Sequence, residues 1–333
     1  MTTLTDTTTD TATEQFRAHV IRGLQLKEKK ISSRYFYDDE GDRLFQKIMA
    51  SPDYYVTRAE EEILRDQTDA VLAALINGHE QFSLFELGAG DGTKTKHLLR
   101  AALDKGKQPT YLPIDISEHV LEELGDALKE EFPTLQYEPM QGEYFDAIKR
   151  GFSDRPGPKA VLFLGSNIGN LDRKQAIALL KGVSEHLGPN DRFLVGFDRK
   201  KDPATILRAY NDREGHTREF NLNLLRRMNT ELGADFNVDR FIHAPVYDPL
   251  SGRALSYIVS TTEQTVIIPG ADGPIHFEAW EALHTEISQK YDKPMIDDLA
   301  AHAGLRRTAT FTDSKEYFRC VVFAPNTKAQ QPT

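Results

Sequence analysis

The stretch FELGAGDG at residues 85–92 decides the fold class of this 333-residue chain. This glycine-rich turn directly follows an apolar run at residues 82–87 and directly precedes a helical pattern at residues 94–103. Glycines at such a junction let the backbone approach a bound ligand closely. Asp115 ends the next apolar run, where an acidic side chain can accept hydrogen bonds from both ribose hydroxyls of a nucleotide. The turn and the acid together predict a nucleotide-type cofactor in an α/β fold.

Around this turn, short apolar runs alternate with amphipathic segments, which is typical of parallel strands joined by crossover helices. We predict five core strands, at residues 82–87, 110–114, 135–140, 160–164 and 192–197. Helices are expected between them at residues 94–103, 118–131 and 173–187. The fold class is therefore α/β with a Rossmann-like sheet.

The pattern changes after the last of these strands. Residues 203–232 are predicted to be helical, and strands follow at residues 240–246, 255–260 and 265–268, which we interpret as an inserted antiparallel unit. The core pattern then returns as a helix at residues 295–303 and strands at residues 308–311 and 317–323. These last two strands predict an antiparallel hairpin at a sheet edge.

Two helices are predicted ahead of the core, at residues 42–49 and 57–75. Thr57 is the expected N-cap of the second helix, with Glu60 three residues later at capping-box spacing. We interpret the acidic run Glu60-Glu61-Glu62 as a helix-start face that suits the helix dipole, not as a binding site.

These elements predict two domains. The N-terminal helices and the insertion form an α+β substrate-binding domain, residues 14–60 plus 199–289. The cofactor-binding α/β domain comprises residues 61–198 plus 290–325. Residues 1–13 and 326–333 are expected to be a disordered leader and a polar tail. Ligands would bind between the domains, at the carboxyl ends of the strands.

Composition narrows the function classes. The chain has 51 Asp+Glu against 41 Lys+Arg, a net charge of −10, which argues against a nucleic-acid partner. The single cysteine, Cys320, excludes an internal disulfide or a multi-cysteine zinc site and favours a cytoplasmic location. No signal peptide is recognisable, and no run reaches the ~18 apolar residues of a membrane span. The ten histidines lack metal-binding spacing, so no metal is expected, and we expect a monomer.

Two cofactor classes use this kind of turn, dinucleotides and S-adenosylmethionine. A dinucleotide site would prefer G-x-G-x-x-G, and the sequence GAGDGT at residues 88–93 does not keep that spacing. The closing strand pair also suits the reversed edge strand that is common in methyltransferases. S-adenosylmethionine is the expected cofactor, and an NAD-dependent dehydrogenase is the disfavoured alternative.

Further motifs occur in order along the chain, namely YFYD (35–38), PDYYVTR (52–58), ELGAG (86–90), FLGSNIGNL (163–171), RAYND (208–212) and TEIS (285–288). In this series the chain resembles the S-adenosylmethionine-dependent histidine Nα-methyltransferases of ergothioneine biosynthesis, over about residues 35–324. The resemblance implies a class I methyltransferase sheet, S-adenosylmethionine as methyl donor and S-adenosylhomocysteine as its product.

On the cofactor side, the resemblance implies a set of binding residues around the glycine turn. They are Gly88 and Gly90 in the turn, Lys94 after it, Asp115 at the ribose, and Glu143 with Tyr144 near the adenine. The family pattern at the last pair is usually Asp-Phe, so this chain departs from it there.

On the substrate side, the resemblance implies that Tyr54, Asn170 and Tyr210 hold the α-amino and carboxylate groups of an amino acid. Tyr54 and Asn170 are then the catalytic residues. Phenols can donate to a carboxylate, and an asparagine carbonyl can accept from an amine, so these residue types suit the task.

Recognition of the substrate side chain is implied for Glu286 and Ser288, at the two nitrogens of an imidazole, with Tyr37 near the same ring. Taken alone, Glu286 would be interpreted as a solvated helix residue. A pocket position that is usually methionine in the family falls at Ser256, so the substrate preference of this chain could differ.

Methyl transfer from a sulfonium needs an unprotonated amine held in line with the S–CH3 bond, and it needs no metal. The resemblance implies three rounds of transfer, which convert histidine to hercynine. Two alternatives stay open: an N-methyltransferase for another amino acid or amine, and a non-catalytic sensor of S-adenosylmethionine or a metabolite on the same fold.

Overall fold

The computed structural model describes residues 5–152, 155 and 157–326. The chain divides into two compact units, each discontinuous in sequence. Unit 1 comprises the described residues up to Tyr55 together with Lys201–Ser288. Unit 2 comprises Val56–Lys200 together with the described residues from Gln289 onward. The predicted domain boundaries are at residues 60/61, 198/199 and 289/290.

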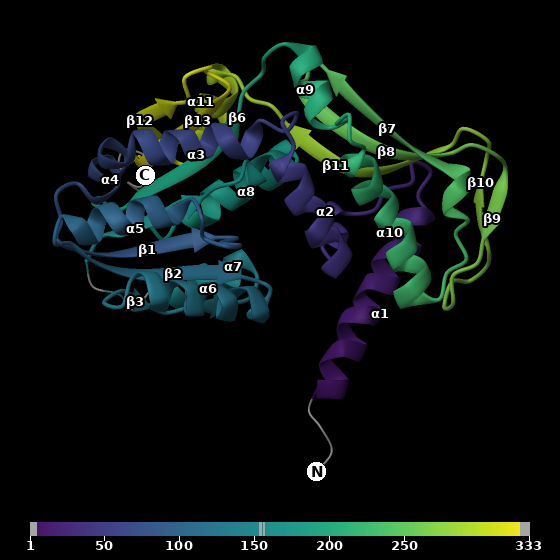
Figure 1. The fold of residues 1–333 in the computed structure, drawn as a ribbon, viewed down its shortest axis with the longest axis horizontal. Coiled ribbons are helices and arrows are strands. Elements are labelled where there is room, and N and C mark those ends of the chain that lie inside the picture. The colour runs from purple at the N-terminus through teal and green to yellow at the C-terminus, as the bar shows by residue number, and fades with distance from the viewer. Residues whose placement is uncertain (1–4, 153–154, 156, 327–333) are drawn as a thin grey trace, which may run out of the picture. The chain divides into compact units, whose positions relative to one another are not determined.

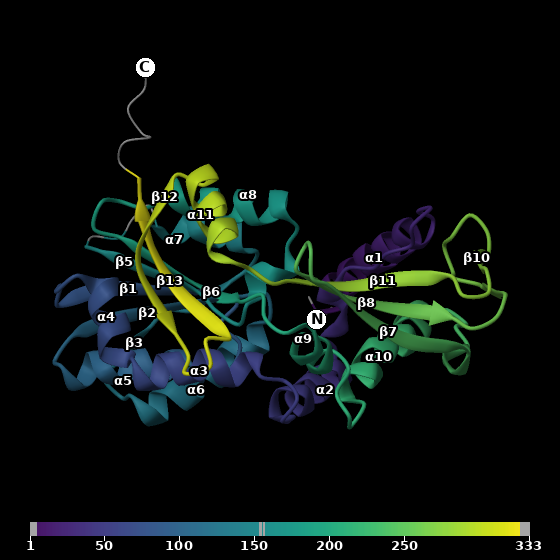
Figure 2. The same cartoon turned by 90° about the horizontal axis from the view of Figure 1, so that it is seen from above.

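Unit 2 is built on an eight-stranded sheet with the order β12-β13-β6-β5-β1-β2-β3, in which β4 also pairs with β2 (Figures 1 and 2). The strands are β1 (Gln81–Leu87), β2 (Gln108–Asp115), β3 (Gln136–Tyr137), β4 (Met140–Gln141), β5 (Lys159–Phe163), β6 (Arg192–Asp198), β12 (Leu305–Thr312) and β13 (Phe318–Pro325). Strands β6, β5, β1, β2 and β3 are parallel, and β13 is antiparallel to both β6 and β12. The mostly parallel sheet and the closing antiparallel pair are both confirmed.

One predicted strand of this sheet is wrong. Residues 135–140 form two separate two-residue strands, β3 and β4, and each pairs with β2. Pro139 lies between them, and a proline cannot donate a backbone hydrogen bond to a neighbouring strand.

Strand β1 occupies the centre of the sheet, between β2 and β5. All of its residues after Gln81 are buried, as expected for a parallel strand that is covered on both faces. The chain passes from β1 to β2 on one side and later returns to β5 on the other. Ligands of open α/β sheets bind where the strand order reverses in this way, at the carboxyl ends of the strands.

Helices cover both faces of this sheet. They are α3 (Val56–Asp66), α4 (Thr68–Ile76), α5 (Thr95–Asp104), α6 (Glu118–Glu131), α7 (Tyr144–Phe152), α8 (Arg173–Ser184) and α11 (Lys293–His302). Buried residues of α7, α8 and α11 share one core with β1, β5, β6 and β13. Helices α3 and α4 pack against β13, β6 and β5.

The predicted helix at residues 57–75 is two helices, and its predicted cap is wrong. Helix α3 already begins at Val56, whose side chain is buried, so Thr57 lies inside the helix. Gln67 leaves the helical conformation between α3 and α4, and its side chain donates to the carbonyl of Thr312 over 2.8 Å.

Unit 1 packs helices against a three-stranded antiparallel sheet, β11-β8-β7, beside a small pair, β10-β9 (Figures 1 and 2). Its helices are α1 (Thr5–Leu24), α2 (Asp39–Ala50), α9 (Pro203–Ala209) and α10 (His216–Leu232), with short 3-10 turns η1 (Ser33–Phe36) and η3 (Val238–Arg240). Its strands are β7 (Phe241–Asp248), β8 (Arg253–Ser260), β9 (Gln264–Val266), β10 (Ile275–Phe277) and β11 (Ala282–Gln289). The core is formed mainly by α1, α2 and α10 with the strands.

The single helix predicted over residues 203–232 is interrupted by a turn. Asp212 accepts hydrogen bonds from the backbone N–H groups of His216 and Thr217, at 2.8 and 2.7 Å, and so caps the start of α10. Gly215 adopts the left-handed conformation that this turn requires, with φ of 78°.

The predicted disordered leader is wrong over residues 5–13, which belong to α1. Phe16, Val20 and Leu24 recur at four-residue spacing and are buried in the core of unit 1, so packing anchors this helix. The predicted tail lies outside the described residues except for Asn326, whose backbone N–H bonds to the carbonyl of Gly304.

Candidate active site

The glycine turn after β1 lies next to two other predicted cofactor residues, Asp115 and Tyr144. Gly88 and Gly90 have φ of 71° and 53°, in the left-handed region that favours glycine. The N–H of Gly90 donates to Asp115 Oδ2 at the end of β2, over 3.3 Å. A Cβ atom at Gly88 would lie 2.6 Å from the hydroxyl oxygen of Tyr144, so a larger residue at this position would displace that phenol.

Tyr144 and Glu143 stand at the start of α7. The Tyr144 ring packs edge-on against Phe163 of β5, with centroids 5.8 Å apart, whereas Glu143 is exposed. Burial, together with the charges of Asp115 and Glu143, raises the pKa of Tyr144 to about 12. The phenol is therefore a hydrogen-bond donor beside the glycine turn at physiological pH.

Lys94, the predicted cofactor residue that follows the turn, is held by a buried acid. Its ammonium pairs with Glu60 Oε2 of α3, and the same oxygen accepts the backbone N–H of Gly165 at 2.8 Å. Burial would lower the pKa of Lys94, but the neighbouring Glu60 carboxylate raises it above its ordinary value. Lys94 is therefore a charged, anchored residue.

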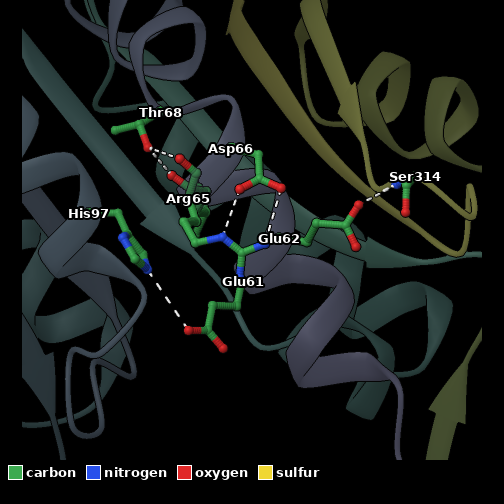
Figure 3. Close-up of polar contacts among 8 residues, drawn as sticks. Glu61, Glu62, Arg65, Asp66, Thr68, His97 and Ser314 are labelled. Carbon is green, nitrogen blue, oxygen red and sulfur yellow. Dashed lines mark hydrogen bonds and ion pairs between the residues drawn. The ribbon is translucent and has the colours of Figure 1, made fainter.

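Glu60 was missed by the sequence analysis, and the interpretation of its acidic run is wrong for this residue. Its side chain is fully buried, in a slot that Gly196 leaves open, because a Cβ atom at Gly196 would lie 2.1 Å from Glu60 Oε1. Figure 3 shows that the next two acids point elsewhere, Glu61 towards His97 and Glu62 towards the backbone N–H of Ser314.

Glu86, the residue before the turn in β1, is a second buried carboxyl in this region. It accepts a hydrogen bond from the hydroxyl of Tyr111. Burial raises the pKa of Glu86 from its ordinary value of 4.5 to about 7, although the bond from Tyr111 opposes the shift. A group with a raised carboxyl pKa holds its proton more tightly in the folded state than in the unfolded state.

Ionisation of Glu86 is therefore expected to lower the free energy of unfolding as pH rises from about 4.5 to about 7. Replacement of Glu86 by a neutral residue should abolish this pH dependence. The free energy of unfolding of Glu86→Gln, relative to that of the wild type, should increase by about 2 kcal/mol from pH 5 to pH 8. Urea denaturation across that range measures the difference, with exposed Glu80→Gln as the control. A constant difference at all pH values would contradict this role of Glu86.

Asn170 lies in a strained turn at the end of β5, the 3-10 turn η2 (Asn167–Asn170). Ser166 before it is left-handed, with φ of 56°, which is uncommon for a residue other than glycine. Its hydroxyl accepts the backbone N–H of Asp198 at 3.3 Å, and Tyr291 donates to the carbonyl of Ile168 at 3.1 Å. The Asn170 side chain is exposed.

A buried ion pair joins the two segments that form hydrogen bonds to this turn, and it was not predicted from the sequence. Lys290 Nζ lies 2.7 Å from Asp198 Oδ2, and both side chains are fully buried. The backbone of Tyr291 also bonds to the carbonyl of Asp198. The pair thus joins the end of β6 to the segment that follows β11.

In unit 1, an aromatic cluster surrounds two predicted substrate residues. Phe45 lies between Tyr37 and Tyr54, with ring centroids 5.6 and 6.3 Å away, and Phe220 lies 5.8 Å from Phe45. Tyr210, directly after α9, is buried. Phe45 and Phe220 were assigned no role from the sequence.

Glu286 and Ser288 lie on strand β11, so the interpretation of Glu286 as a helix residue is wrong. Leu283 and Ile287 are four residues apart, the spacing of a helix face, which explains why the strand was not recognised. Ser256 of β8 is buried and donates to Glu286 Oε2 at 3.3 Å.

The predicted site residues thus form two groups, one in each unit. Unit 2 carries the six predicted cofactor residues and Asn170, and unit 1 carries Tyr37, Tyr54, Tyr210, Glu286 and Ser288. Among the residues that the structure describes, no group of acidic, histidine and cysteine side chains could hold a metal ion. No helix in the described part of the chain has the length and hydropathy of a membrane span.

Comparison with known proteins identifies the family of this chain. Residues 16–325 match the family described as histidine-specific methyltransferase, SAM-dependent, where SAM is S-adenosylmethionine. The chain belongs to this family. The mostly parallel sheet with its reversed edge strand therefore belongs to an S-adenosylmethionine-dependent methyltransferase, and the disfavoured dehydrogenase alternative is wrong.

Similar proteins in this histidine-specific methyltransferase family carry consistent names. The histidine N-alpha-methyltransferases of Mycolicibacterium smegmatis and Mycobacterium tuberculosis are each 35% identical to this chain. The matches cover 91% and 89% of this chain, and 93% and 91% of those proteins. Ergothioneine biosynthesis protein 1 of Neurospora crassa is 31% identical over 87% of this chain and 32% of its own length. The protein is an S-adenosylmethionine-dependent histidine methyltransferase.

Proposed function

We propose that the protein transfers methyl groups from S-adenosylmethionine to the α-amino nitrogen of L-histidine. Three rounds would give hercynine, a step of ergothioneine biosynthesis, with S-adenosylhomocysteine as the second product of each round. The observation that carries the proposal is the contact between the Gly90 N–H and Asp115 Oδ2, at the reversal point of the sheet in a chain of this family. A monomer in a reducing cytoplasm suits the single, buried cysteine, Cys320.

The residues of unit 2 fit the methyl donor. Asp115 offers carboxylate oxygens for ribose hydroxyls, and the left-handed Gly88 and Gly90 leave the backbone open to close approach. Tyr144 presents an aromatic ring and a hydroxyl beside the turn. When bound, the donor supplies a methyl group on a positively charged sulfur, which requires no metal.

Tyr54, Tyr210 and Asn170 each have side-chain chemistry that fits an amino acid. Tyr54 and Tyr210 can donate to its carboxylate, and the Asn170 carbonyl can accept from its amine. These neutral groups hold the amine in line with the methyl group and let water take the released proton. The faces of Phe45 and Tyr54 suit an amine that becomes permanently cationic after the third transfer.

Glu286 and Ser288 support histidine as the amino acid. A carboxylate can accept an imidazole N–H, and a hydroxyl can serve the other ring nitrogen. A purely apolar side chain would leave that carboxylate poorly paired. The small Ser256 beside Glu286 favours a second candidate, another amino acid or amine with a different side chain.

Mass spectrometry of the products tests the proposal directly. The protein is incubated with S-adenosylmethionine and an equimolar mixture of free amino acids. Addition of three methyl groups to histidine alone supports the proposal, and modification of another amino acid supports the second candidate. Cofactor binding without any product would make the protein a sensor.

Asn170→Ala is expected to lower kcat/KM for histidine on the order of 100-fold, because the amine loses its acceptor and its alignment with the methyl group. The affinity for S-adenosylhomocysteine, measured by calorimetry, should stay within about twofold of the wild type. Exposed Asn237→Ala serves as the control. An Asn170→Ala enzyme with normal kcat/KM would contradict the assignment.

A further inference from the structure

One ion pair in unit 1 ties the segment that carries Tyr54 to the segment that carries Tyr210. The Arg213 guanidinium donates through Nε to Asp53 Oδ2 at 3.1 Å and through Nη2 to Asp53 Oδ1 at 3.0 Å. The backbone N–H of Arg213 also donates to Asp53 Oδ2, at 3.1 Å. Asp53 directly precedes Tyr54, and Arg213 lies three residues after Tyr210.

This pair differs from an ordinary surface salt bridge. The Asp53 side chain is only 6% exposed, whereas that of Arg213 is 70% exposed, so the arginine covers the carboxylate on its solvent side. Charge-assisted bonds in a two-pronged arrangement fix orientation as well as distance, which a single exposed contact does not. The third bond, from the backbone, joins the carboxylate to the loop itself.

Local hydrogen bonds fix the backbone of both segments, the one around Tyr54 and the one around Tyr210, next to the ion pair. The loop that carries Arg213 is fixed by Asp212, which caps α10. In the other segment, Ser51 accepts the backbone N–H groups of Asp53 and Tyr54 through its hydroxyl and its carbonyl. A movement of either segment would therefore be passed to the other through the pair.

A second contact fastens the residue on the other side of Tyr54. Lys201 Nζ donates to the Tyr55 hydroxyl at 2.7 Å and lies 4.2 Å from the centroid of the same ring. Asp53 and Tyr55 are thus both held by the segment that runs from Lys201 to Arg213. Tyr54 is the residue between these two anchors.

We propose that Asp53 and Arg213 are positioning residues, which fix the phenol of Tyr54 relative to that of Tyr210. The pair acts through the two tyrosines on the amino and carboxylate groups of the amino-acid substrate. This inference rests on the proposed function, because that function assigns both tyrosines to the substrate. Binding of the methyl donor should not depend on the pair, because the proposed donor residues belong to unit 2.

A graded set of variants tests the proposal by steady-state kinetics with histidine and S-adenosylmethionine. Asp53→Ala removes all three bonds and should raise KM for histidine on the order of 10-fold, with a smaller change in kcat. Arg213→Ala keeps the backbone bond and should have a smaller effect, and Arg213→Lys should lie between Arg213→Ala and the wild type. The double variant Asp53→Ala/Arg213→Ala should be no worse than Asp53→Ala, because both changes break one interaction.

The control is Arg43→Ala, which removes an exposed pair with Glu40 in the same unit. The affinity for S-adenosylhomocysteine should be unchanged throughout. Larger losses in Arg213→Ala than in Asp53→Ala, or additive losses in the double variant, would mean that Arg213 binds the substrate itself and would overturn the proposal. A lower melting temperature with an unchanged KM would also overturn it, because the pair would then be merely structural. Turnover of histidine by the wild type tests the proposed function separately.

Discussion

Lys290→Met is expected to lower the free energy of unfolding by about 3–5 kcal/mol, because it removes the counter-charge of a fully buried carboxylate. The Lys290 ammonium lies 2.7 Å from Asp198, and neither side chain is exposed. A carboxylate left in that position retains its desolvation cost without the attraction that offset it. Urea denaturation followed by circular dichroism measures the loss.

The chain offers a matched control for this variant. Lys293 pairs with Asp297 one turn along α11, but both side chains are substantially exposed, so Lys293→Met should cost less than about 1 kcal/mol. The double variant Asp198→Asn/Lys290→Met should be more stable than Lys290→Met, since no charge is then buried alone. Equal losses in the two lysine variants would contradict the buried-pair argument.

Activity should fall with stability in Lys290→Met. The backbone of Asp198 bonds to Ser166, and Tyr291 bonds to Ile168, so the turn that carries Asn170 rests on the segments joined by the pair. Weakening of the pair should loosen the turn and lower kcat at temperatures where the protein is still folded.

Glu60→Gln is expected to cost about 3 kcal/mol of stability and to weaken cofactor binding. The glutamine amide oxygen can still accept the Gly165 N–H, but a neutral amide cannot balance the charge of Lys94. Glu60 contacts both Lys94, which follows the glycine turn, and Gly165, which lies two residues before the η2 turn. The glycine turn and the η2 turn should therefore both shift. Calorimetry with S-adenosylhomocysteine measures the binding loss, and urea denaturation the stability loss.

Neighbours on the same helix provide the control for Glu60. Glu61 and Glu62 have the same side chain one and two residues further on, and they contact His97 and the backbone N–H of Ser314 (Figure 3). The Glu61 side chain is 35% exposed, whereas that of Glu60 is fully buried. Glu61→Gln and Glu62→Gln should each cost less than about 1 kcal/mol. If Glu60→Gln behaves like these two, its burial does not matter for the site.

The order of the core elements could be predicted from the sequence because local patterns determine it. The apolar run, the glycines and Asp115 stand at short, fixed spacings, and the structure brings Gly90 and Asp115 into contact. Asp212 could not be recognised as a helix cap, because the helical periodicity continued on both sides of it.

Residues whose role depends on distant partners were the ones that the sequence analysis missed. Glu60 looks like an exposed helix residue until the fold places Lys94, Gly165 and Gly196 around it. Asp198 and Lys290 are likewise separated by the whole second segment of unit 1. Glu286 was given a role at the substrate only through family resemblance. Taken alone it would be interpreted as a helix residue, since its apolar neighbours follow helix spacing, whereas it lies on strand β11.

The pairing of β13 with β6 determines how a cut chain would behave. Six residues of each strand are in antiparallel register, although the second segment of unit 1 separates them in sequence. A protease that nicks the exposed turn at Leu250, between β7 and β8, would break the chain but not this pairing. The two fragments should therefore stay together in solution and separate only in denaturant. Unit 2 is thus suited to fragment complementation, in which two separately synthesised pieces reassemble along the seam between β6 and β13.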